Sequence, residues 1–191
     1  FVGTYCSGSS LVFAELASQT SLIVLSYSAT NTKLSYKQFY PYFGRVVPTD
    51  KYQTAVLGDL IVELNISVIV MAVQTQDAYS DGLADSLNVY LTEEVENDDK
   101  VLVYKVGMNA EEPQDEDFDA VISSILSKGS PVIVLLSHTE FAVSLFSAWN
   151  TSKYQSSAPY TDFLWFGPDG WLTSTDALSI APRGTSGTLG A

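Results

Sequence analysis

The chain has 191 residues, a formal net charge of −13, 46% hydrophobic residues and only 16% charged residues. This length fits one large α/β domain or two smaller lobes, and the apolar share is enough for a packed interior. The negative charge disfavours nucleic acid and anionic membrane surfaces as partners, because both carry phosphate groups. Half of the 22 acidic residues lie between Glu93 and Asp119. We interpret this block as a solvated surface, because no loop has the ligand spacing of a calcium site.

The cysteine count restricts the chemistry further. The single cysteine, Cys6, excludes an internal disulfide framework and a zinc site made of several thiolates. We interpret Cys6 as a small buried apolar residue, and we expect no metal and no cofactor. No apolar run approaches the roughly 20 residues that a membrane-spanning helix needs, so none is predicted. Two sequons, at Asn65 and Asn150, are candidate glycosylation sites if the chain is secreted.

Apolar segments alternate along the chain with segments of helical period. The apolar segments are nearly continuous, which is typical of strands buried on both faces of a parallel sheet. Strands that alternate with helices predict a doubly wound α/β fold. The predicted strands are Phe1–Tyr5, Ser21–Ser28, Val68–Gln74, Lys100–Val106, Pro131–Ser137 and Phe163–Gly167. We expect no signal peptide, because Phe1 opens directly on the first of these strands. The predicted helices are Ser9–Gln19, Asp50–Leu64, Tyr79–Leu91, Asp115–Ser127 and Thr139–Asn150.

Two of these helices have clear apolar faces, which we expect to pack on the sheet. In the helix Asp115–Ser127 the apolar residues recur three and four apart: Phe118, Val121, Ile122, Ile125 and Leu126. The helix Asp50–Leu64 has Thr49 or Asp50 as its cap. Its predicted buried side consists of Val56, Leu57, Leu60, Ile61 and Leu64.

The segment from Asn31 to Pro48 interrupts this alternation. It holds five aromatic residues and two prolines and has no period, which is typical of a link between two packed units. The segment Arg183–Ala191 is rich in Gly, Ser and Thr, and we predict that it is the return crossing.

Three strand ends carry residues that suit a small polar ligand, which in open α/β sheets binds beyond the carboxyl ends of the strands. Cys6–Ser10 precedes a helix, and its backbone N–H groups and hydroxyls suit a carboxylate. Ser26–Thr30 presents hydroxyls at alternate residues, and Gly167–Trp171 holds Asp169 in a turn beside an indole. An acid opposite an anion-accepting turn would bind both ends of a zwitterion. Each segment also has a simpler explanation, respectively a helix cap, a strand end and an ordinary turn.

The sequence offers little for catalysis. It lacks a G-x-S-x-G elbow, a G-x-x-x-x-G-K-[ST] phosphate loop and a G-x-G-x-x-G fingerprint. The only histidine, His138, can be paired on paper with Cys6 or with a serine and an aspartate, but no spacing supports either arrangement. We expect His138 to begin the helix at Thr139. An α/β enzyme remains an alternative that would need His138 in the cleft.

A set of motifs covers essentially the whole chain, beginning with the serine-rich helix start and Ser28-Ala29-Thr30 within Gly3–Thr30. The other motifs are Leu34-Ser35-x-Lys37, Tyr42-Phe43-x-Arg45-x-Val47-Pro48-x-Asp50, Gln53 with Ala55, Asn65, Tyr79-x-x-Gly82, Asp117-Phe118, Asp169-Gly170-Trp171 and Ser186-Gly187-Thr188-Leu189-Gly190. Together these motifs resemble the ligand-binding region of class C G-protein-coupled receptors, the metabotropic glutamate and calcium-sensing kind.

The resemblance implies a two-lobed clamshell of the type I periplasmic-binding-protein fold that binds an α-amino acid without acting on it. It places Ser7, Ser28 and Thr30 on the first lobe, and Tyr79 and Asp169 on the second. Ser7 and Thr30 would hold the carboxylate and amino group of the ligand. Asp169 would pair with the ammonium, and the Tyr79 ring would cover it. The lobes would close because one ligand is held by both.

By the same resemblance, residues 1–45 are a portion of lobe 1 with the crossover, residues 46–184 are lobe 2, and residues 185–191 start the return crossing. The rest of the clamshell and a membrane domain would lie outside this sequence. The expected location is the extracellular face of the plasma membrane or the secreted state, as a homodimer or heterodimer. Ser174 stands where glutamate receptors have an arginine, which weakens the case for an acidic ligand.

Two further alternatives share this fold. A soluble amino-acid transport protein would deliver its ligand to a permease, and a bacterial signal sequence upstream would indicate it. A scaffold module would have lost its ligand, and a cleft filled by side chains would indicate that.

Overall fold

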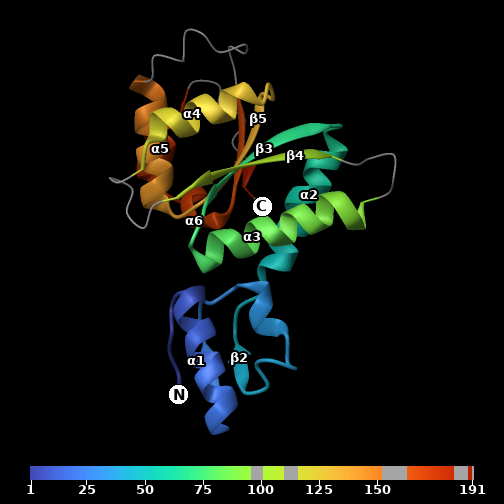
Figure 1. The fold of residues 1–191 in the computed structure, drawn as a ribbon, viewed down its shortest axis with the longest axis vertical. Helices are drawn as coiled ribbons and strands as arrows, with labels where there is room; N and C mark the ends of the chain where they lie inside the picture. Colours follow the sequence, from blue (N-terminus) through green and yellow to red (C-terminus); the bar gives the residue numbers. More distant parts are fainter. Residues whose placement is uncertain (96–100, 110–115, 152–162, 183–188, 191) are drawn as a thin grey trace.

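The computed structural model describes residues 1–95, 101–109, 116–151, 163–182 and 189–190. They form two units, a small N-terminal unit and a larger second unit (Figure 1). The N-terminal unit and the link contain α1 (Ser7–Thr20), β1 (Val24–Ser26), the 3₁₀ helix η1 (Thr32–Ser35) and β2 (Phe43–Arg45). The second unit contains α2 (Asp50–Glu63), β3 (Val68–Gln74), α3 (Ala78–Val89), the π-helical turn η2 (Tyr90–Glu94), β4 (Leu102–Met108), α4 (Phe118–Ser127), β5 (Val132–Leu136), α5 (Thr139–Thr151), β6 (Leu164–Gly167), α6 (Asp169–Leu172), α7 (Thr175–Ile180) and β7 (Leu189–Gly190).

All paired strands are parallel, as the continuous apolar runs predicted. The second unit has a five-stranded sheet in the order β4-β3-β5-β6-β7, and the N-terminal unit has a two-stranded sheet of β1 and β2. The predicted α/β fold with parallel sheets is therefore confirmed. Within the described ranges, no helix is both long enough and apolar enough to cross a bilayer.

The central strands β3 and β5 of the large sheet are buried on both faces, and successive residues of β3 face opposite sides. On β3, Ile69 and Met71 pack with α2 and α3, whereas Val70 and Ala72 pack with α4 and α5. Figure 1 shows these two pairs of helices on the two sides of the sheet. Burial of both faces explains why the strand sequence is a continuous apolar run.

The apolar stripe predicted for α4 is confirmed. Four of its members are buried against the sheet, and Leu126 is partly buried beside them. The helix begins at Phe118, after Asp117 accepts a hydrogen bond from the backbone N–H of Ala120 as its cap. Part of the predicted first turn, Asp115, lies outside the described residues.

The predicted buried side of α2 is partly wrong. Leu57 and Ile61 are buried, but Val56 is 56% exposed and Leu64 is 48% exposed. The helix packs instead on a face that includes Gly58, where the ring of Tyr90 occupies the space that a Cβ atom would need. Because of this close approach, α2 buries the face that contacts α3 and η2. The apolar face that the sequence period predicts is only partly buried. Of the two predicted cap residues, Thr49 and Asp50, the cap is Thr49, whose hydroxyl accepts a hydrogen bond from the backbone N–H of Lys51.

The N-terminal unit is smaller than its sequence suggested. The predicted strand Phe1–Tyr5 is wrong, because only Val2 makes an isolated bridge, to Leu25, and both Phe1 and Tyr5 are exposed. The backbone at Thr4 has a left-handed φ of 66°, which interrupts an extended strand. The predicted strand Ser21–Ser28 is reduced to its central residues in β1. The core of this unit consists of Ala14, Ala17, Val24, Ala29, Leu34 and Phe43.

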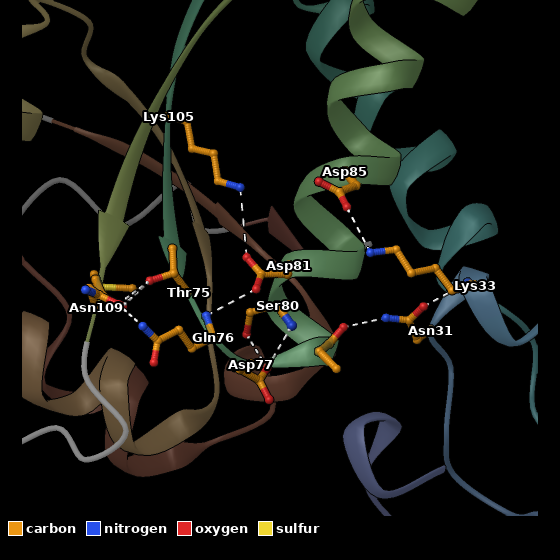
Figure 2. A network of polar contacts seen from close by, with 12 residues as sticks. Asn31, Lys33, Thr75, Gln76, Asp77, Ser80, Asp81, Asp85, Lys105 and Asn109 are labelled. Carbon is orange, nitrogen blue, oxygen red and sulfur yellow. Dashed lines mark hydrogen bonds and ion pairs between the residues drawn. The ribbon is translucent and has the colours of Figure 1, made fainter. Parts of the chain in front are cut away.

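The link between the two units is fastened to α3. Asn31 donates a side-chain hydrogen bond to the carbonyl of Ala78, and Lys33 forms an ion pair with Asp85 at 3.4 Å (Figure 2). Gly82 has no room for a side chain, because a Cβ atom there would clash with the amide nitrogen of Asn31. The contact therefore fixes the residues just before η1 against the helix that also borders the cleft.

Candidate ligand-binding site

A cleft of about 470 Å³ lies between the two units, at the carboxyl ends of the sheet strands. The order of the sheet places β4 and β5 on opposite sides of β3, so the winding reverses there, which is where open α/β sheets bind ligands. Figure 1 shows α1 below the end of the sheet where α3 and α6 begin. The residues that line the cleft are Tyr5, Cys6, Ser7, Ser28, Thr30, Asp77, Tyr79, His138, Thr139, Glu140, Asp169 and Gly170.

All five residues predicted to bind ligand lie in the wall of this one cleft. Ser7, Ser28 and Thr30 come from the N-terminal unit, and Tyr79 and Asp169 come from the second unit. They are up to 162 positions apart in the sequence, since the first is residue 7 and the last is residue 169. The fold therefore brings the hydroxyls of the N-terminal unit to face a carboxylate and a phenol of the second unit. We call the first side, with Ser7, Ser28 and Thr30, the hydroxyl wall. The second side, with Tyr79 and Asp169, is the acidic wall.

The hydroxyl wall is built on the first turn of α1. Cys6 is the residue before the helix and makes no side-chain cap, so the first backbone N–H groups of α1 keep their capacity to bind an anion. Ser7 is buried, and its hydroxyl accepts a hydrogen bond of 3.3 Å from the backbone N–H of Asn31. The Ser26 hydroxyl accepts the backbone N–H of Ala29 at 2.9 Å and thereby holds the turn that presents Ser28. Ser7 is thus a first-turn residue of the helix rather than its cap.

Cys6 is a correction to the sequence interpretation. It is exposed and lines the cleft, so it is not a buried apolar residue. The reason is local, since the residue before a helix has an extended backbone, here with ψ of 148°, that turns the side chain away from the helix core. Its thiol lies on the same wall as Ser7.

The acidic wall is fixed by contacts around Asp169. The Tyr79 hydroxyl donates to the carboxylate Oδ1 of Asp169 at 3.0 Å, and the Gln53 amide reaches the same atom at 3.4 Å. Burial, and next the negative charge of Asp169, hold the pKa of Tyr79 well above its usual range. Tyr79 therefore remains a donor at physiological pH. Thr139 anchors the backbone of this turn by a hydrogen bond to the carbonyl of Gly170.

The segment predicted as a turn at Asp169 is helical. Pro168 precedes the short helix α6, and Asp169 is its first residue. Trp171 is fully buried and donates from its indole N–H to the carbonyl of Leu135 at 2.9 Å. The indole thus belongs to the core beneath the cleft, and only the acid faces the ligand space.

His138 and Asp77 are cleft residues that the sequence did not assign to the site. The imidazole Nε2 lies 3.4 Å from the Asp77 carboxylate, and the ring stacks on Tyr79 at 5.1 Å. The hydrogen bond with Asp77 raises the pKa of His138 despite burial. Burial acts to raise the pKa of Asp77, but hydrogen bonds from His138 and Ser80 outweigh it, so that pKa is lowered. As predicted, α5 begins right after His138, whose carbonyl accepts the backbone N–H of Ala142.

Asp50 is a further residue that the sequence interpretation missed, because it was considered only as a helix cap. It is 3% exposed, and its Oδ2 has no hydrogen-bond partner among the described residues. Burial raises the pKa of Asp50 to about 6, a hydrogen bond from Thr30 opposes the shift, and the charge of Asp169 adds to it. Asp50 thus lies next to Thr30, to whose carbonyl its backbone N–H also donates at 3.0 Å, and within electrostatic range of Asp169.

The two candidate glycosylation sites remain predictions. Asn65 is exposed after the end of α2. Asn150 is exposed on α5, and its amide donates to the carbonyl of Ile180. The serine of the second sequon, Ser152, lies outside the described residues.

Comparison with known proteins identifies the family of this chain. The family described as "Receptor family ligand binding region" matches residues 1–190. A Pseudomonas aeruginosa protein named "Amino acid binding protein" is 26% identical over 132 residues, which cover 69% of this chain and 33% of that protein. Mouse metabotropic glutamate receptor 4 is 23% identical over 198 residues, which cover 97% of this chain and 20% of the receptor. The chain therefore spans a third or less of the length of these relatives.

Proposed function

Because this chain belongs to the family of receptor ligand-binding regions, we propose that it is the amino-acid-sensing part of a class C receptor-like protein. In this proposal it binds an α-amino acid without catalysis, at the extracellular face of the plasma membrane or in secreted form. The remainder of the clamshell and a membrane domain complete the protein, which works as a homodimer or heterodimer.

One observation carries the proposal, namely that hydroxyls and a carboxylate face each other across one cleft. The ligand carboxylate binds at the start of α1, where Ser7 and the free backbone N–H groups favour an anion. The ligand ammonium pairs with Asp169, and the ring face of Tyr79 covers it. Thr30 contacts the amino group from the opposite wall. Since one ligand contacts both walls, it stabilises the closed state over the open one.

The decisive experiment is the change of Asp169 to alanine in the full-length protein. Calorimetry with amino acids should show that D169A abolishes binding, because the ammonium loses its counter-charge. The matched control is D176A, an exposed acid in the first turn of α7 that does not line the cleft. Binding by D169A with unchanged affinity would reject the site assignment.

A transport binding protein is the second candidate, and the Pseudomonas relative supports it. It would use the same cleft, so the D169A result does not separate the two. Ligand-dependent signalling by the full-length protein supports the receptor, whereas delivery of the amino acid to a permease supports the transporter.

One requirement of the enzymatic alternative is met, because His138 lines the cleft. However, the Nε2 atom of His138 contacts the carboxylate of Asp77, and the imidazole ring is stacked on Tyr79. An aspartate beside a histidine also occurs in catalytic sites, but in the described residues no serine, threonine or cysteine side chain is hydrogen-bonded to this imidazole. The scaffold alternative predicts a filled cleft, and the open volume of about 470 Å³ counts against it.

A further inference from the structure

We infer that the ligand is an α-amino acid with a positively charged side chain, and that Glu140 is the residue that selects it. This inference rests on the proposed function and names the ligand class for the same cleft. It follows from the distribution of charge over the cleft wall.

The charged groups that line the cleft are mostly acidic. Asp77, Glu140 and Asp169 contribute carboxylates, and His138 is the one basic residue among the lining residues that the structure describes. No lysine or arginine occurs in that described lining. A ligand with an acidic side chain would therefore meet repulsion on this wall, whereas a ligand with a second cation would meet attraction.

Two of the three carboxylates already have partners. Asp77 contacts His138 and accepts two hydrogen bonds of 2.8 Å from Ser80, one from the backbone and one from the hydroxyl. Asp169 accepts from Tyr79 and, in the proposed function, pairs with the α-ammonium of the ligand. Within the described part of the chain, the side chain of Glu140 makes no hydrogen bond and no ion pair, and its charge acts on His138 only through space. It is thus the carboxylate that remains for a second cation.

One extended amino acid can contact both Asp169 and Glu140, because both side chains line the cleft. Asp169 and Glu140 lie on the same wall, from the starts of α6 and α5. An amino acid with its α-ammonium at Asp169 and an extended side chain along this wall would bring a terminal cation to Glu140.

A purely structural role for Glu140 makes a different prediction. Glu140 lies in the first turn of α5, where the helix dipole favours an acid. Such an acid affects the stability of the helix, but it does not change the preference between two ligands of the same shape. Asp119 in the first turn of α4 has that structural position without lining the cleft, so it provides the matched control.

The test is calorimetry on the full-length protein with lysine, norleucine and cadaverine. Norleucine has the lysine shape without the side-chain ammonium, and cadaverine lacks the carboxylate. Wild type and D119N should bind lysine about tenfold more tightly than norleucine. E140Q should bind both with similar affinity, through weaker binding of lysine and unchanged binding of norleucine.

The outcomes separate the two proposals. Equal binding of lysine and norleucine by wild type would overturn the inference and leave amino-acid binding intact. A lysine preference that survives in E140Q would overturn the role of Glu140. Cadaverine bound as tightly as lysine, or no binding by any amino acid, would overturn the proposed function itself.

Discussion

The two units differ in how much of their apolar surface they bury. The second unit encloses the seven-residue strand β3 between helices on both faces, and its core contains large residues such as Trp165 and Phe146. The N-terminal unit has two three-residue strands and a core made largely of alanine and other small side chains. Most of the large apolar side chains that are exposed in the described ranges belong to the N-terminal unit. The cleft thus joins a well-packed acidic wall to a hydroxyl wall whose supporting core is thin.

The sharpest test of this comparison replaces one buried leucine in each unit. Leu135 on β5 and Leu34 on η1 are both fully buried. L135A should lower the free energy of unfolding by about 4 kcal/mol, because dense surroundings leave a cavity that cannot collapse. L34A should cost about 2 kcal/mol, because its small, open surroundings can relax. Urea unfolding of the full-length protein measures both losses. An equal or larger loss for L34A would contradict the denser packing of the second unit.

A smaller effect is expected at Asp50, on the boundary between the units. Its folded pKa of about 6 lies above the ordinary value of 3.8. The folded protein therefore binds this proton more tightly than the unfolded chain, and stability falls as pH rises from about 4 through about 6. At pH 8, D50N should be more stable than wild type by about 1–2 kcal/mol, once the lost attraction to Arg45 is included.

Thermal unfolding between pH 4 and pH 8 measures this difference for D50N. The variant should also show a flatter pH dependence than wild type between pH 4 and pH 6. A less stable D50N at pH 8 would mean that the pairing with Arg45 outweighs the burial of the charge.

The smallest effect concerns the His138–Asp77 pair on the acidic wall. The pKa of His138 is raised in the folded protein. Its contribution to the free energy of unfolding is therefore fully present below about pH 6.5 and is lost as pH rises through the pKa of the folded state. The pKa of Asp77 is lowered, so its contribution is present above about 3.9 and is lost as pH falls through the folded value. The pair therefore stabilises most between these limits, with Glu140 adding to the field at the imidazole.

The variant H138Q measures this contribution, because His138 is the only histidine in the chain. H138Q should lose about 0.5–1 kcal/mol near pH 5.5 and less at pH 8, a small amount because both side chains are partly exposed. A loss that does not change with pH would assign His138 a packing role, through its stacking on Tyr79.

The same contrast explains how far the sequence predicts the structure. Long apolar runs such as Val68–Gln74 and the stripe of α4 determine their own burial, so the parallel sheet and that helix were predicted well. In the N-terminal unit the runs are short, and one left-handed residue, Thr4, is enough to end a strand. On α2, a contact with Tyr90 from a distant helix selected the buried face, which no local period shows.

The sequence predicted some of the residues that line the cleft but not others. Hydroxyls and acids at strand ends drew attention to Ser7 and Asp169, because that position in an α/β sheet is itself a signal. His138 and Asp77 meet only through the adjacency of β3 and β5, which single-sequence reasoning does not provide. The strand-end rule applied to the segment after β5 would have found His138 and Glu140.

The most direct test of the central claim uses Cys6, which lies exposed on the hydroxyl wall of the cleft. The rate at which iodoacetamide alkylates this residue in the full-length protein can be followed by mass spectrometry of its peptide. If an amino acid occupies the cleft between Ser7 and Asp169, saturating lysine should slow alkylation about tenfold or more. An unchanged rate under conditions where calorimetry shows lysine to be bound would place the ligand elsewhere and contradict the account.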